Sequence, residues 1–83
     1  MSNELSPRQK EIVQYIANGH TVMQIAKLMG LEYGTVKGHV RKAKEKFNAK
    51  SAAHCVAIAI VRGDIKVDLA LDTPLNQRPN GGN

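Results

Sequence analysis

Two capping boxes determine where the first helices of this 83-residue chain begin. In the first, Ser6 and Gln9 have the spacing at which each side chain bonds the backbone N–H of the other, and Pro7 suits the first helical position. Apolar residues then recur at helical spacing as Ile12, Val13, Ile16 and Ala17. Asn18 and Gly19 end this helix, because glycine readily adopts the left-handed backbone of a C-terminal cap.

The second capping box, Thr21 with Gln24, opens another short helix that Gly30 closes. Its apolar positions at helical spacing are Val22, Ile25, Ala26 and Met29. Only two residues separate Gly30 from the next periodic segment, which starts at Tyr33. Two helices joined by a short turn with a glycine are typical of a helix-turn-helix, although an ordinary helical hairpin without a nucleic-acid role has the same layout.

The third segment, residues 33–48, favours the nucleic-acid interpretation because of its charge. Its apolar residues form one narrow stripe, which consists of Val36, Val40, Ala43 and Phe47. Residues 33–50 carry six lysine and arginine side chains against Glu45 alone, which accounts for the whole net charge of +5. A charge run is often only a solvated helix face, but its concentration on one element indicates a polyanionic partner.

The cations of this segment lie on two flanks of the apolar stripe. Those on one side are Lys37, Arg41 and Lys44, and those on the other are Lys42 and Lys46. A helix in the major groove of DNA needs central side chains for base edges and flanking ones for both phosphate walls. Gly34 and Gly38 each cost about 1 kcal/mol of helix stability relative to alanine. The presence of the two glycines suits a helix that another surface approaches closely. The alternative is that they arose by neutral drift.

A fourth helix is predicted for residues 52–62, with Ser51 as its N-cap and Gly63 as its stop. It is apolar nearly all round, whereas a helix of a small domain buries only one face against its own core. The second face therefore needs another cover, most simply the same helix of a second subunit. The alternative cover is the carboxy-terminal tail.

Residues 64–83 form the last segment of the chain. Ile65, Val67, Leu69 and Leu71 alternate with other residues, which predicts a short extended arm that packs on the domain or on a neighbour. From about residue 72 the sequence has no apolar periodicity and is expected to be disordered. The sequence thus divides into a domain at residues 1–63 and an extension at residues 64–83.

Other classes of protein are disfavoured. The single cysteine, Cys55, allows no intrachain disulfide and indicates a cytoplasmic protein, and the sequence has neither a secretory signal nor a membrane-spanning apolar run. His54 and Cys55 point about 100° apart on a helix, and the three histidines lack the spacing of a zinc site. We therefore predict no catalytic residue, no metal, no cofactor and no membrane association.

Several motifs at matching offsets point to one family. They are Leu5 to Val13 (LSPRQKEIV), Gly19-His20-Thr21, Ile25-Ala26 and Thr35 to Val40 (TVKGHV). They resemble the LuxR-type (FixJ/GerE-like) helix-turn-helix DNA-binding domain, which opens with L-T-x-R-E-x-E-V-L and has T-V-K-x-H in its recognition helix. The resemblance runs from Leu5 to about Gly63 and implies an all-α domain of four helices.

The resemblance also implies a dimeric, sequence-specific transcription regulator of bacterial or phage origin that binds double-stranded DNA. Its third helix would enter the major groove, with Lys37, Gly38 and Arg41 facing the bases and Thr35 near phosphate. The full set of residues expected at DNA is Thr21, Tyr33, Gly34, Thr35, Lys37, Gly38, His39, Arg41, Lys42 and Lys44. The fourth helix would form a homodimer, with Cys55, Val56 and Ala59 in the core and Ala53, His54, Ala57, Ile58 and Val61 at the interface.

The sequence departs from the family pattern at several positions. Glu32 occupies a cap position that is usually Ser or Thr, which suits the helix dipole but not a phosphate contact. Gly38 has no side chain with which to read a base, and Val22 and Met23 replace polar residues. No sensor module precedes the domain in these 83 residues, which predicts a single-domain member controlled by its abundance, by a partner protein or by DNA occupancy alone.

Two other functions are open at this point. An interaction protein would pair through the fourth helix with full-length LuxR-type regulators and titrate them, although the retained cations favour DNA binding. A module like region 4 of sigma factors shares G-T-V-K, here Gly34 to Lys37, but His39 and the apolar fourth helix favour the LuxR type. Besides DNA, the partners to consider are therefore a second copy, a LuxR-type regulator and RNA polymerase.

Overall fold

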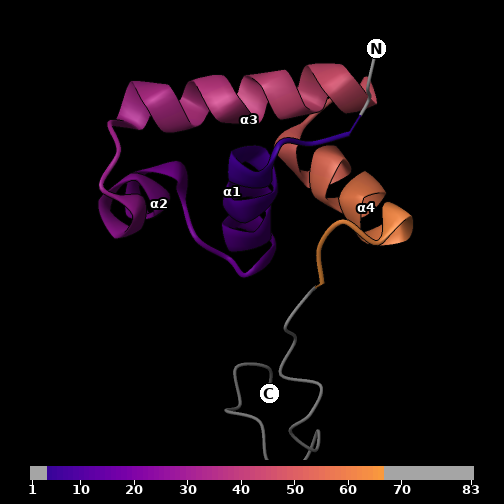
Figure 1. The fold of residues 1–83 in the computed structure, drawn as a ribbon, viewed down its shortest axis with the longest axis horizontal. Coiled ribbons are helices and arrows are strands. Elements are labelled where there is room, and N and C mark those ends of the chain that lie inside the picture. Colours follow the sequence, from indigo (N-terminus) through magenta and orange to yellow (C-terminus); the bar gives the residue numbers. More distant parts are fainter. Residues whose placement is uncertain (1–3, 67–83) are drawn as a thin grey trace, which may run out of the picture.

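The computed structural model describes residues 4–66, which form four α-helices (Figure 1). They are α1 (Pro7–Ala17), α2 (Val22–Met29), α3 (Tyr33–Phe47) and α4 (Ala52–Arg62). This part of the chain contains no strand, so the predicted all-α fold of four helices is confirmed. α3 is the longest helix and lies across the other three in Figure 1, with α1 between α2 and α4. Within residues 4–66, no helix has both the length and the apolar character needed to span a membrane.

Both predicted capping boxes are present. The Ser6 hydroxyl accepts from the Gln9 backbone N–H at 3.1 Å, and the Gln9 side chain accepts from the Ser6 backbone N–H at 2.9 Å. Thr21 and Gln24 form the same pair of bonds at 3.1 and 2.9 Å. Each box satisfies two backbone donors that the first turn of a helix leaves without an intrahelical partner. The starts of α1 and α2 are therefore determined by local chemistry.

The predicted stops are also confirmed. Gly30 and Gly63 end α2 and α4 with φ angles of +68° and +81°. Asn48 ends α3 with φ +54° and is the one non-glycine residue with a positive φ among residues 4–66. α1 ends differently in detail, because Asn18 keeps a negative φ and Gly19, one residue later, takes the positive φ of +96°.

Two clusters of buried side chains hold the helices together, and α1 contributes to both. The buried residues of the first cluster, which joins α1 to α3 and α4, are Leu5, Val13, Ala43, Cys55, Ala59 and Ile65. Those of the second cluster, which joins α1 to α2 and α3, are Ile12, Ile25, Ala26 and Val36. The apolar stripe predicted for α3 is confirmed, since Val36 and Ala43 are fully buried and Val40 and Phe47 pack against the clusters. The opposite face of α3 therefore points to solvent.

The chain after α4 packs on α1 up to the last described residue. Ile65 is 5% exposed and belongs to the first cluster. The Gln14 side chain donates to the backbone carbonyl of Lys66 and accepts from its backbone N–H, much as a neighbouring strand would. The predicted packing of an arm thus holds for Ile65, whereas Val67, Leu69, Leu71 and the predicted disorder after residue 72 lie outside the described residues.

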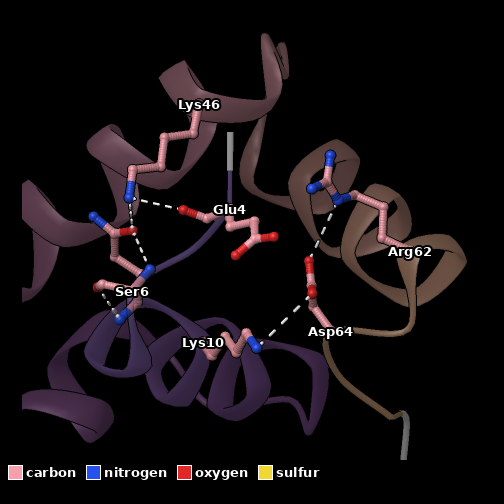
Figure 2. Close-up of polar contacts among 7 residues, drawn as sticks. Glu4, Ser6, Lys10, Lys46, Arg62 and Asp64 are labelled. Carbon is pink, nitrogen blue, oxygen red and sulfur yellow. Dashed lines mark hydrogen bonds and ion pairs between the residues drawn. The ribbon is translucent and has the colours of Figure 1, made fainter. Parts of the chain in front are cut away.

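Charged side chains support the same junction. Asp64 forms ion pairs with Lys10 at 4.0 Å and with Arg62 at 3.5 Å (Figure 2). The Arg62 guanidinium also lies over the Phe47 ring, 4.8 Å from its centroid. Ion pairs near the surface contribute about 0–1 kcal/mol each, so the burial of Ile65 contributes more to holding this segment.

Ser6→Ala is expected to lower the free energy of unfolding by about 1 kcal/mol, because the Gln9 backbone N–H at the start of α1 loses its acceptor. Urea denaturation followed by far-ultraviolet circular dichroism measures this change. Ser6→Thr keeps a hydroxyl at the cap and is the matched control, expected to stay close to the wild type. An alanine variant as stable as the wild type would show that the cap does not stabilise α1.

Candidate nucleic-acid interface

A short turn, residues 30–32, sets α3 at a fixed angle to α2. Gly30 and Leu31 form a Schellman motif, in which the Leu31 N–H donates to the Ala26 carbonyl at 2.9 Å. Leu31 also packs against the second cluster, so the turn is anchored in the core. Glu32, the N-cap of α3, makes no side-chain cap bond and is exposed.

All ten residues predicted at DNA are at least partly accessible. The exposed ones are Thr21, Tyr33, Gly34, Thr35, Lys37, Arg41 and Lys42. The half-buried ones are Gly38, His39 and Lys44. The Nδ1 atom of His39 is buried and has no hydrogen-bond partner within residues 4–66. The outward face of α3 therefore combines exposed cations with one half-buried histidine, His39.

A hollow of about 440 Å³ lies on this face, between α3 and the start of α2. The residues that line it are Val22, Gly34, Lys37, Gly38, Val40, Arg41 and Lys44. It thus brings together five of the ten predicted residues, among them three cations, and its lining contains no acidic residue. The remaining five, which are Thr21, Tyr33, Thr35, His39 and Lys42, lie outside this lining. A hollow lined by cations in this way attracts an anionic ligand.

The two glycines of α3 are not required by packing within the described part of the protein. A Cβ atom added at Gly34 or Gly38 would meet no atom within 4 Å, apart from its chain neighbours and the helix backbone. Neither residue has a positive φ. Alanine would therefore fit at both positions and would favour the helix, so the glycines leave bare backbone on the outward face at a cost in stability.

Lys46 does not belong with the outward cations, although the sequence placed it on a flank with Lys42. Its ammonium group donates to the backbone carbonyl of Glu4 and to the side-chain carbonyl of Gln9, both at 2.9 Å (Figure 2). Gln9 is 5% exposed, and the same oxygen atom accepts from the Ser6 N–H of the first capping box. Lys46 therefore fastens the end of α3 to the start of α1. Sequence reasoning missed this contact because no local pattern indicates it.

α4 exposes an apolar face beside the one that it buries. Cys55 and Ala59 are buried and Val56 is half-buried, in agreement with the family-based expectation. Of the five residues predicted at a dimer interface, Ala53, His54, Ala57 and Val61 are exposed and Ile58 is half-buried. Val61 is 87% exposed, a large fraction for an aliphatic side chain, and Ile60, which the sequence did not single out, is 38% exposed.

His54 and Cys55 have separate surroundings. The Nδ1 atom of His54 accepts from the backbone N–H of Lys50 at 3.1 Å. Cys55 is 2% exposed, and burial raises the pKa of its thiol, with the Lys44 charge opposing this in part. A raised pKa keeps the thiol protonated at neutral pH, whereas the thiolate is the reactive form. Cys55 is therefore a packing residue of the first cluster.

The tight turn between α2 and α3 and the basic outward face of α3 define a helix-turn-helix DNA-binding domain. The model of the family of bacterial regulatory proteins called luxR (GerE) matches residues 3–59, and the chain belongs to this family. The resemblance inferred from the sequence is thereby confirmed. The members of this family are bacterial regulatory proteins.

Known regulators are similar to this chain over its helical domain. It is 36% identical over 58 residues to the transcriptional activator protein TraR of Rhizobium radiobacter, which covers 70% of this chain and 25% of TraR. The Vibrio cholerae VqmA dimer without target DNA is similar with a TM-score of 0.71 at 28% identity, over 81% of this chain and 30% of that one. A VqmA–ligand–DNA complex gives 0.68 at 30% identity, over 77% and 28%. The chain thus spans between a quarter and a third of the length of these regulators.

Lys46→Met is expected to lower the free energy of unfolding by about 1–2 kcal/mol, because two hydrogen bonds from a charged donor are lost while the aliphatic stem is kept. Lys42→Met is the matched control on the same helix. Lys42 is exposed, so its substitution should change stability by less than about 0.5 kcal/mol. Equal unfolding midpoints for the two variants in urea would contradict the role of Lys46.

Proposed function

We propose that this chain binds specific sequences of double-stranded DNA as a homodimer and regulates transcription in the bacterial cytoplasm, with α3 in the major groove. The observation that carries the proposal is the hollow on α3, where Lys37, Arg41 and Lys44 converge beside the bare backbone of Gly34 and Gly38. The major groove admits an α-helix and presents a distinct pattern of donors and acceptors at each base pair.

Lys37 and Arg41 are the proposed readers of base edges. Both are exposed, both line the hollow, and lysine and arginine pair well with the O6 and N7 atoms of guanine. Gly38 lies between them in the sequence and offers close approach in place of a side-chain contact. The residues proposed to position the helix on phosphates and sugars are Thr21, Thr35, His39, Lys42 and Lys44.

A second copy of this chain is the proposed cover of the exposed face of α4. Ala53 and Ala57 are small, so they would let two α4 helices approach closely, and Val61 would gain burial of a side chain that is 87% exposed in the single chain. His54 and Ile58 would complete the interface. A symmetric pair uses the same patch twice and would place two α3 helices for the two halves of an inverted repeat.

Lys37→Ala and Arg41→Ala are expected to relax the sequence preference, each at about 1–3 kcal/mol of discrimination, because each removes a proposed base contact. Lys42→Ala should instead weaken binding about equally on all sequences. It should also reduce the slope of log affinity against log salt by about 1, as expected for one lost phosphate contact. Fluorescence anisotropy on a preferred and an unrelated duplex, over a range of salt, measures both quantities.

The control for the salt slope is Lys46→Met. In the wild type, the Lys46 ammonium group is hydrogen-bonded to Glu4 and Gln9 of the same chain. The substitution removes the same charge from the same helix and should leave the slope unchanged. A uniform loss of affinity on both duplexes for Lys37→Ala and Arg41→Ala would contradict the proposal that these residues read bases.

Ala57→Glu is expected to convert the dimer to a monomer, because it places a carboxylate in the centre of the proposed apolar interface on each side. Sedimentation equilibrium measures the mass. Met23→Glu is the control, since Met23 is 56% exposed on α2 and the substitution adds the same charge away from α4. An unchanged mass for Ala57→Glu would contradict the assignment of the dimer interface to α4. A wild-type chain that pairs only with a longer LuxR-type regulator would instead favour the alternative function, in which the chain titrates such regulators.

A further inference from the structure

Tyr33 and Lys37 form a pair at the start of α3. The Lys37 ammonium lies over the Tyr33 ring, 5.6 Å from its centroid, within the range of a cation–π interaction. The two residues are four positions apart, so they are neighbours on one face of the helix. Side chains of an α-helix point back towards its N-terminus, which brings the long lysine side chain over the residue one turn earlier.

Core packing does not explain the position of this tyrosine. Tyr33 is 48% exposed and belongs to neither buried cluster. Its ring therefore stands on the surface at the first residue of α3, next to a lysine that lines the hollow. The partner of the ring within residues 4–66 is the ammonium group of Lys37.

The kind of partner matters for a lysine that has to meet an anion. The ion pairs found within residues 4–66 join Arg8 to Glu11 and Asp64 to Lys10 and Arg62, so Lys37 is in none of them. A carboxylate would hold the ammonium but cancel its charge. An aromatic face attracts the cation through its quadrupole and leaves the full positive charge for another partner.

We infer that Tyr33 is a positioning residue for Lys37, whose ring holds the ammonium in one orientation before DNA is bound. A free lysine side chain loses much rotamer freedom when it binds, and a side chain already restrained loses less. The Tyr33 ring therefore raises the affinity for the preferred sequence through Lys37. This inference rests on the proposed function, because it assumes that Lys37 meets DNA.

A double-mutant cycle on a preferred duplex tests the inference. Tyr33→Leu removes the aromatic face and is expected to weaken binding about 2- to 5-fold, the range of an exposed cation–π pair. In the Lys37→Met background the same substitution should change binding very little, because the ring has no cation to hold. An equal loss in both backgrounds would overturn the inference, since Tyr33 would then act independently of Lys37.

Tyr33→Phe separates the ring from the hydroxyl group. It keeps the aromatic face and should restore most of the affinity that Tyr33→Leu loses. If Phe and Leu weaken binding equally, the hydroxyl contacts DNA directly and the positioning role is wrong. Thermal unfolding of each variant distinguishes these losses from a damaged fold.

A second readout does not depend on DNA. In the free wild-type protein, the ring current of Tyr33 should shift the proton resonances of the Lys37 ε-methylene group upfield, and Tyr33→Leu should remove this shift. Ordinary lysine resonances in the wild type would overturn the positioning role even if specific DNA binding is observed. A wild-type chain that shows the upfield shift but binds all duplexes equally would overturn the proposed function, and with it the claim that the pair serves sequence recognition.

Discussion

The orientation of α3 depends on the burial of two neighbouring residues of α1. Ile12 and Val13 lie on different sides of α1 and belong to the two separate clusters, so this one helix contacts each of the other three. Burial of a side chain of this size contributes about 1.5–3 kcal/mol, whereas an exposed ion pair contributes about 0–1 kcal/mol. The apolar core therefore determines where α3 lies, and its outward charges contribute little to the fold.

The same helical period that buries one side of α3 gathers its cations on the other. Val36 and Ala43 fix the inner face, and Lys37 and Arg41 consequently stand on the outer one. The outer face is bare backbone at Gly34 and Gly38, which weakens the helix in isolation. Concentrated positive charge and bare backbone on one helix face do not stabilise the fold. Contact with a large anion explains both, because the charge attracts the anion and the bare backbone lets it approach closely.

The helices were predictable from the sequence because their ends are determined by chemistry over a few residues. The capping boxes at Ser6 and Thr21 act within three positions, and the stop at Gly30 depends on one backbone conformation. Contacts between distant residues have no such local pattern. Lys46 bonds Gln9, 37 positions away, so the sequence could give its side of the helix but not its partner. The outward cations followed from periodicity, while the contact between Tyr33 and Lys37 also depends on side-chain rotamers.

Selection of bound sequences from a randomised pool of duplex DNA, at near-physiological salt, is the decisive test of sequence-specific binding by a dimer. We expect enrichment of an inverted repeat whose half-sites lie about one helical turn apart, because two α3 helices related by a two-fold axis would read two major-groove segments on one side of the duplex. Retention of DNA that depends on salt but enriches no sequence would contradict this expectation, since such binding needs only the positive charge of α3.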